Sequence, residues 1–108
     1  MHSTLSQQLE AYVTRNNFPA AEWEEKGLNP SDEDVQTAMQ QAVVDFVQHL
    51  QAILPVTSPG TPTMTAAVQN FLEEWDIDNF DTEEREFLYD VAADIMRVVQ
   101  VQPEDIDL

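Results

Sequence analysis

Residues 31–54 read SDEDVQTAMQQAVVDFVQHLQAIL, and this stretch decides the fold. It opens with a serine and three acidic residues, which is typical of a helix start with Ser31 as the cap. Apolar residues then recur at the three- and four-residue spacing of one helical face. The residues of this stripe are Val35, Met39, Ala42, Phe46, Leu50 and Ile53. A helix of this length is roughly 33–36 Å long, which is enough to span a small domain.

Two shorter helices are expected before this stretch. The first covers about residues 4–16, because four apolar residues share one face at helical spacing. These residues are Leu5, Leu9, Tyr12 and Val13. The second is a helix of about two turns within residues 18–27, bounded by Pro19 in its first turn and by Gly27 at its end.

A proline-rich break follows the long helix. Residues 55–63 read PVTSPGTPT, and three prolines with a glycine cannot propagate a helix. Beyond it, apolar residues at helical spacing predict a helix that starts near Thr63 or Thr65 and another from Asp81 to about residue 99. Asp81 and Glu84 have the spacing of a capping box at the start of that last helix.

The predicted fold class is therefore all-α. We expect a compact bundle of four to five helices, in which two helical halves are joined by the Pro-rich loop and the two long helices pack together. Residues 1–101 are expected to form a single helical domain, and residues 102–108 a frayed acidic tail.

The charge is the feature that bears on function. Twenty-one acidic residues against four basic ones give a formal net charge of −17 in 108 residues. A small domain kept soluble by charge would usually carry a magnitude of about 2–8, so the excess suggests a surface selected for its field. Apolar residues make up 43% of the chain and are patterned, which favours a folded acidic domain over a disordered one.

The same composition argues against several classes of function. The chain has no cysteine, one histidine away from its N-terminus (His49) and no phosphate-binding glycine motif. We therefore expect no catalytic residues, no cofactor and no metal site, and His49 is interpreted as a partly buried structural residue beside the apolar stripe. A calcium loop starting at Asp76 would need an oxygen ligand where Phe80 stands and a glycine at Asp81.

Location and partners follow from the charge as well. The N-terminal residues lack the basic start and apolar core of a signal peptide, no apolar run approaches the length of a membrane span, and an anionic membrane would repel the chain. A cytoplasmic protein without a membrane or nucleic-acid partner is expected.

Ten acidic residues lie between residues 73 and 94, where Arg85 is the only base. One interpretation is a solvated face, which is what a charge run usually means. The functional interpretation is a docking surface for a cationic partner. The candidate partner-binding residues are Glu73, Glu74, Asp76, Asp78, Glu83, Glu86, Asp90 and Asp94.

Several segments carry a resemblance to a family. They are Asn29-Pro30-Ser31, then 81–86 (DTEERE), Tyr89 and Ile95-Met96. Through them, about residues 29–101 resemble a small bacterial family known only as a domain of unknown function. The resemblance implies an all-helical fold and brings no catalytic residue and no ligand.

These observations favour a non-enzymatic protein-binding module. The favoured function is an inhibitor or immunity-type partner of a basic protein such as a nuclease toxin. Three alternatives stay open: a DNA mimic that competes for a DNA-binding protein, a self-associating structural module, and a hydrolase that uses unrecognised carboxylates. The protein is expected to be a monomer or a homodimer.

Overall fold

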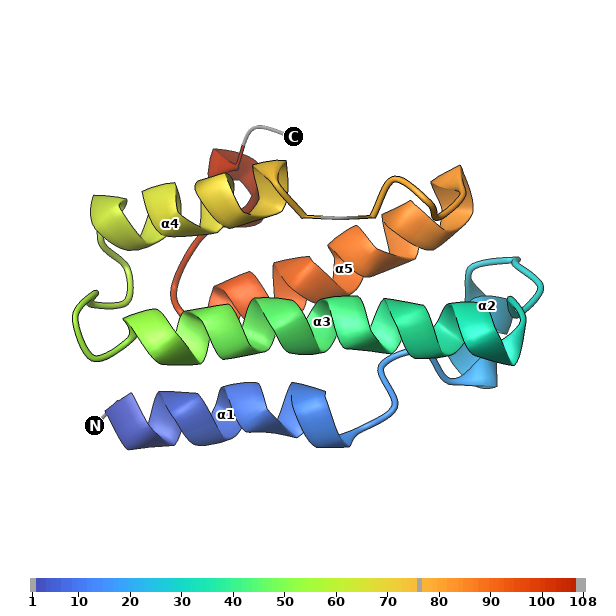
Figure 1. Ribbon diagram of the computed structural model, residues 1–108, viewed down its shortest axis with the longest axis horizontal. Helices are drawn as coiled ribbons and strands as arrows, with labels where there is room; N and C mark the ends of the chain where they lie inside the picture. The colour runs from blue at the N-terminus through green and yellow to red at the C-terminus, as the bar shows by residue number, and fades with distance from the viewer. Residues whose placement is uncertain (1, 76, 107–108) are drawn as a thin grey trace.

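α3 (Glu33–Ile53) runs the length of the molecule and organises the other helices (Figure 1). The computed structural model describes residues 2–75 and 77–106, and within these the fold is all-α, as predicted. The other elements are α1 (His2–Thr14), α2 (Ala20–Glu25), α4 (Pro62–Glu73), α5 (Thr82–Val98) and the short 3₁₀ helix η1 (Pro103–Asp105).

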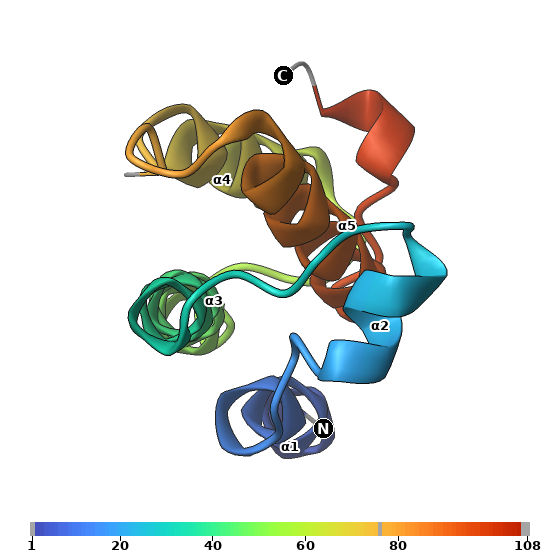
Figure 2. The same ribbon diagram turned by 90° about the vertical axis from the view of Figure 1, so that its right-hand side faces the viewer.

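The two long helices, α3 and α5, pack against each other and run in the same direction. α1 and α4 run the opposite way, and the view along the long axis shows them on either side of the α3–α5 pair (Figure 2). The extents are 39 × 27 × 21 Å, so the molecule is elongated along these helices. The parallel arrangement places the N-terminal ends of α3 and α5 at the same end.

The core follows the apolar stripes that the sequence predicted. The stripe of α3 is buried from Met39 to Leu50, and that of α5 from Phe87 to Met96. α2 adds Trp23, and the turn before it adds Phe18, both of which pack edge-on against Phe87. α1 contributes Leu9, which is fully buried.

α4 joins the bundle through aromatic side chains. Phe71 of α4 stacks on Phe46 of α3, with ring centroids 5.2 Å apart. Trp75, just beyond α4, lies 5.8 Å from Phe46 and donates a hydrogen bond from Nε1 to the carbonyl oxygen of Ala42 at 3.1 Å. Tyr89 of α5 completes this aromatic layer, with its ring centroid 6.2 Å from that of Trp75.

Two of the predicted helix ends are confirmed. The capping box of α5 is complete: Asp81 Oδ1 accepts from the Glu84 N–H at 2.8 Å, and Glu84 Oε1 accepts from the Asp81 N–H at 2.9 Å. Gly27 ends α2 with a φ of 74°, and the Leu28 N–H donates to the Trp23 carbonyl at 2.9 Å. This is the bonding pattern of a Schellman motif.

The predicted cap of α3 is wrong. Asp32 is the N-cap residue, and its side chain makes no capping hydrogen bond. The Ser31 hydroxyl instead donates to Glu84 Oε2 at the start of α5. Ser31 therefore joins two helix starts and does not cap its own helix.

The expected fraying of the C-terminal tail also differs from the structure over residues 102–106. η1 contacts α5, and Ile106 is only 8% exposed. Val101 is buried as well. Two apolar side chains thus hold this acidic segment against the bundle. Among the helices described, none is long and apolar enough to cross a membrane.

Candidate functional site

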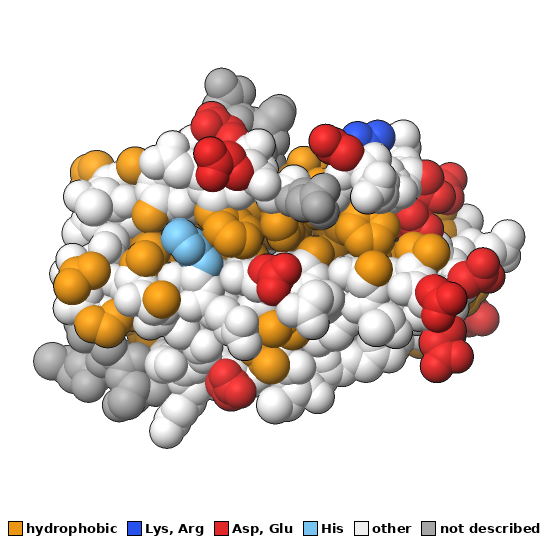
Figure 3. Space-filling view, in the orientation of Figure 1, with side chains coloured by type: hydrophobic (Ala, Val, Ile, Leu, Met, Phe, Trp, Pro, Cys, Tyr) orange, Lys and Arg blue, Asp and Glu red, His pale blue; other side chains and the backbone are white. Residues whose placement is uncertain are grey.

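α3 and α5 begin at the same end of the molecule, with α2 beside them, and each of these segments carries exposed acidic residues (Figures 1 and 2). We call this surface the acidic end. Its members are all exposed: Glu22, Glu24 and Glu25 of α2, Asp32, Glu33 and Asp34 at the start of α3, and Asp81, Glu83 and Glu86 at the start of α5. Red side chains are dense at this end in the space-filling view (Figure 3).

Part of this clustering has a structural cause. The N-terminal end of a helix carries a partial positive charge, so acidic residues in the first turn stabilise it. Because α3 and α5 are parallel, their first turns lie at the same end of the molecule. The acidic residues in these two first turns are therefore at the same end as well. The number of acids exceeds this need, since α2 adds Glu24 and Glu25 beyond its own first turn.

Few cations offset the acidic end. Lys26 lies beside it, but its Nζ pairs with Asp90 Oδ2 at 2.5 Å. Arg85, in the first turns of α5, forms no ion pair with any residue that the structure describes. Glu84 is buried, and its carboxylate accepts from Ser31 and from the Asp81 backbone. Both oxygens of the Glu84 carboxylate therefore take part in hydrogen bonds, and the one from Ser31 links the starts of α3 and α5.

One continuous stretch toward the opposite end of the molecule carries no charged residue. No Asp, Glu, Lys or Arg occurs between Asp45 and Glu73, a stretch that covers the second half of α3, the Pro-rich loop and most of α4. The loop exposes Val56, whose side chain is 86% accessible. Within α3 itself, the charged residues therefore lie between Glu33 and Asp45, while Glu10 of α1 and Asp105 of η1 lie beside the uncharged stretch.

Four of the predicted partner-binding residues lie along α5. Glu83 and Glu86 belong to the acidic end and are exposed. Asp90 and Asp94 are also exposed, but each has a basic partner: Lys26 for Asp90, and Arg97 for Asp94 at 2.8 Å. They line a hollow of about 380 Å³ between α5 and the segment from α1 to α2, where Arg15 and Lys26 face them. Of these four carboxylates on α5, only Glu83 and Glu86 therefore lack a basic partner among the described residues.

Three of the other four predicted residues lie around the end of α4. Glu73 and Glu74 are exposed there, and Glu73 Oε1 accepts a hydrogen bond from Gln69 at 3.1 Å. Asp78 is exposed in the connection to α5, and Asp76 lies outside the described residues. The structure therefore divides the predicted set between the acidic end, the hollow beside Lys26 and the end of α4. Their role in binding remains a prediction.

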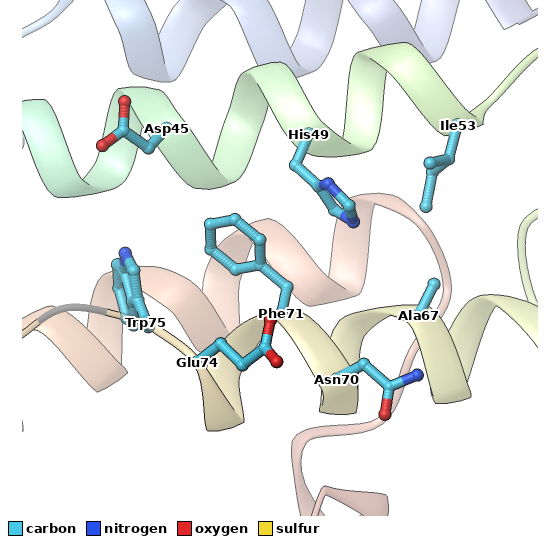
Figure 4. Close-up of a pocket in the computed structure, with 8 residues that line it drawn as sticks. All are labelled: Asp45, His49, Ile53, Ala67, Asn70, Phe71, Glu74 and Trp75. Atoms are coloured by element: carbon cyan, nitrogen blue, oxygen red, sulfur yellow. The ribbon is translucent and has the colours of Figure 1, made fainter.

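Sequence reasoning missed a groove between α3 and α4. It has a volume of about 610 Å³. Its lining residues are Asp45, His49 and Ile53 of α3, Ala67, Asn70 and Phe71 of α4, and Glu74 and Trp75 beyond it (Figure 4). The sequence signal for one wall was present, since Asp45, His49 and Ile53 are spaced four residues apart on one helical face. Nothing in the spacing indicated which residues of α4 would lie opposite.

The groove offers groups for binding. His49 is half-buried and stacks on Phe71, with ring centroids 4.9 Å apart and planes at 29°. Asp45 and Glu74 are exposed carboxylates on its two sides, and no Lys or Arg lines it. The side chains that line the groove include two carboxylates and one imidazole, and no hydroxyl or thiol.

Comparison with known families decides the affiliation of the chain. The sequence model of a family described as a domain of unknown function, DUF4844, matches residues 1–108. The chain belongs to this family. The resemblance seen over residues 29–101 therefore extends over the whole chain, including the helices before Asn29 and the segment after Val101. No curated protein matches the chain. No solved structure matches it either.

The acidic residues of this DUF4844 chain do not converge as metal ligands in the described part. Within residues 2–75 and 77–106, no group of three or more His, Asp or Glu side chains is arranged to hold a metal ion. The calcium-like spacing considered for the sequence begins at Asp76, which lies outside that part.

Proposed function

We propose that this chain is an acidic protein-binding module that docks a basic protein through its acidic end. The observation that supports the proposal most directly is the convergence of exposed carboxylates from α2, α3 and α5 on one end, with Arg15, Lys26 and Arg85 as the nearby cations. The uncharged stretch between Asp45 and Glu73 lies away from this end, which would make the field uneven over the surface. A partner with a positive surface would be drawn to one end of the molecule and not to all sides.

Such a field would act first on the rate of association. Opposed charges steer two proteins together, and the effect falls as salt screens them, with a Debye length of about 10 Å at 0.1 M ionic strength. The carboxylates of the acidic end stand on helices that are fixed by buried contacts and by the Ser31–Glu84 hydrogen bond. A partner would therefore meet a preformed charge pattern.

The finer proposal is inhibition, of the kind that immunity proteins exert on nuclease toxins. Enzymes that bind nucleic acid carry Lys and Arg in their clefts because phosphates must be neutralised there. A folded domain with a dense carboxylate surface would cover such a cleft and exclude the nucleic acid. The fold supplies the surface, and no catalytic group of this chain is needed for that role.

The test is capture of basic proteins from the host lysate at low and high salt by the purified domain, followed by identification of the captured proteins. A triple variant, Glu24→Lys, Glu25→Lys and Glu86→Lys, reverses charges of the acidic end. None of the three residues lies in the first turn of its helix, so helix dipoles are spared. The expected result is loss of the basic partner, both in this variant and at high salt.

The matched control carries the same change in net charge elsewhere. Glu10→Lys, Glu104→Lys and Asp105→Lys alter exposed residues outside the acidic end. This control should retain the partner at low salt. If both triple variants lose it equally, net charge and not the acidic end is responsible, and if neither does, the acidic end is not the docking surface.

A further inference from the structure

We propose that the α3–α4 groove receives an arginine side chain of the basic partner. This inference rests on the proposed function and names the residue by which the partner would be anchored. The groove combines an aromatic floor, formed by Phe71 and Trp75, with a carboxylate on each side, Asp45 and Glu74 (Figure 4).

The electrostatics of the groove favour a cation. Both carboxylates are exposed, and none of the four basic residues of the chain lines the groove. Glu74 is also the C-cap of α4, so the groove opens at the negative end of that helix dipole. An anion would meet two carboxylates there, and a purely apolar ligand would strip water from them without replacing their hydrogen bonds.

The aromatic side chains distinguish arginine from other cations. Phe71 is half-buried, and Phe46 and His49 hold its ring in place by stacking at 5.2 Å and 4.9 Å. A guanidinium is planar and weakly hydrated, so it packs on aromatic rings while its five N–H groups stay free to donate. A lysine ammonium is a compact, strongly hydrated charge that gains less from such a floor.

The groove is also large enough for more than one side chain. Its volume of about 610 Å³ lies in the range of about 300–1,000 Å³ typical of ligand sites. Its uncharged portion, with Ile53 and Ala67, lies toward the Pro-rich loop and would cover the aliphatic stem or a neighbouring apolar residue. Arginine is enriched among the residues that dominate binding energy at interfaces, which fits this anchoring role.

The inference is tested by NMR titration of the full chain with Nα-acetyl-arginine amide, with the lysine and norleucine analogues as comparisons. The two tryptophans provide an internal control, because Trp75 lines the groove and Trp23 packs against Phe87 at α2. The expected result is a saturable shift of the Trp75 indole N–H and of the Ala67 methyl group, with the Trp23 indole unmoved. Lysine should bind more weakly, and norleucine should not bind.

Variants assign the contacts. Asp45→Asn and Glu74→Gln each remove one charge from an exposed position, so folding should be unaffected. Each should weaken arginine binding by about two- to fivefold, the range for an exposed ion pair. Phe71→Leu should weaken it by a similar factor through loss of the cation–π contact. The matched controls Asp34→Asn and Glu86→Gln carry the same charge change at the acidic end and should leave the affinity unchanged.

Shifts of both tryptophans alike, or equal weakening by groove and control variants, would overturn the inference, because the cation would then be responding to the field of the whole molecule. The proposed function has a separate readout. If the partner is captured through the acidic end while arginine does not bind the groove, the groove inference alone fails. If arginine binds the groove but no basic protein depends on the acidic end, the proposed docking function alone fails.

Discussion

Ser31 and Glu84, which lie 53 positions apart in the sequence, are joined by a hydrogen bond from the Ser31 hydroxyl to Glu84 Oε2. The other oxygen of the same carboxylate accepts from the Asp81 backbone in the α5 capping box. One buried carboxylate therefore fixes the start of α5 and ties it to the segment that leads into α3. The geometry of the acidic end depends on this contact.

The Ser31–Glu84 contact predicts a coupled loss of stability. Glu84→Ala should lower the free energy of unfolding by about 1–3 kcal/mol, and Ser31→Ala by about 1 kcal/mol, because each removes partners of a buried polar group. A double-mutant cycle by urea denaturation compares the double variant with the two single variants. The loss of stability in the double variant should be smaller than the sum of the two single losses by at least about 0.5 kcal/mol. Glu83→Ala, at the exposed neighbouring position, should change stability by less than about 1 kcal/mol. Strict additivity of the pair would contradict the contact.

A second polar link joins the end of α1 to α3. Asn17 is 6% exposed, and its Nδ2 donates to the Tyr12 carbonyl at 2.7 Å and to Gln40 Oε1 at 2.9 Å. Gln40 Nε2 donates to the same carbonyl at 3.1 Å. Asn17→Ala should cost about 1–2 kcal/mol, because both hydrogen bonds donated by the buried Asn17 amide would be lost, while each acceptor keeps one other donor.

Gln41→Ala is the control for this link. Gln41 is adjacent to Gln40 but exposed, and its amide donates only to the exposed Asp45 among the bonds described. Its replacement should change the free energy of unfolding by less than about 0.5 kcal/mol. Comparable losses for both variants in thermal or urea unfolding would show that the buried link is not the cause.

Gly27 is predicted to be needed for its backbone conformation alone. Its φ is 74°, and a Cβ at this position would meet no atom within 4 Å. Gly27→Ala should therefore destabilise the protein by about 1–2 kcal/mol through the left-handed conformation and not through a clash. Gly27→Asn should cost less, because asparagine tolerates that region better. Equal losses for alanine and asparagine in urea unfolding would argue for a different cause.

Salt should stabilise this protein. The described residues contain only two ion pairs, Lys26–Asp90 and Arg97–Asp94, whereas the acidic end crowds like charges. Raising the ionic strength from about 0.01 M to about 1 M shortens the Debye length from about 30 Å to about 3 Å. The repulsion among the carboxylates should then weaken by more than the attraction within the two ion pairs. The free energy of unfolding in urea should rise with sodium chloride.

The charge-reversal variant at Glu24, Glu25 and Glu86 gives the internal check on this salt effect. It relieves the crowding directly, so its stability should depend less on salt than that of the unaltered protein. A fall in stability with salt, or the same slope in both proteins, would mean that repulsion at the acidic end does not limit stability.

The helices were predictable because their stability depends on local patterns. Apolar spacing identified the stripe of α3 from Met39 to Leu50, and the Asp81–Glu84 pair identified the start of α5. Both features are encoded within one or two turns. The end of α2 was predictable for the same reason, since Gly27 alone supplies the left-handed residue that the motif requires.

What failed depended on residues far apart in the chain. Ser31 stands where a capping residue is expected, but its hydroxyl donates to Glu84 instead. The two residues come close only because α3 and α5 pack in parallel, and the sequence does not reveal that packing. The tail was expected to fray because chain termini often do, but Ile106 is buried beside α5. The groove has the same origin: Asp45 of α3 and Glu74, the C-cap of α4, line one groove only because α4 packs near α3.

The uncharged loop at the far end of α3 has a practical consequence. Val56 is almost fully accessible, and the chain contains no cysteine, so Val56→Cys would introduce a single thiol at the end opposite the carboxylates. Tethering that thiol to a sensor chip or a fluorophore would orient every molecule alike, with its carboxylates directed into solution. Immobilisation through surface amines would instead consume Lys26, the one lysine of the chain, and remove the partner of Asp90.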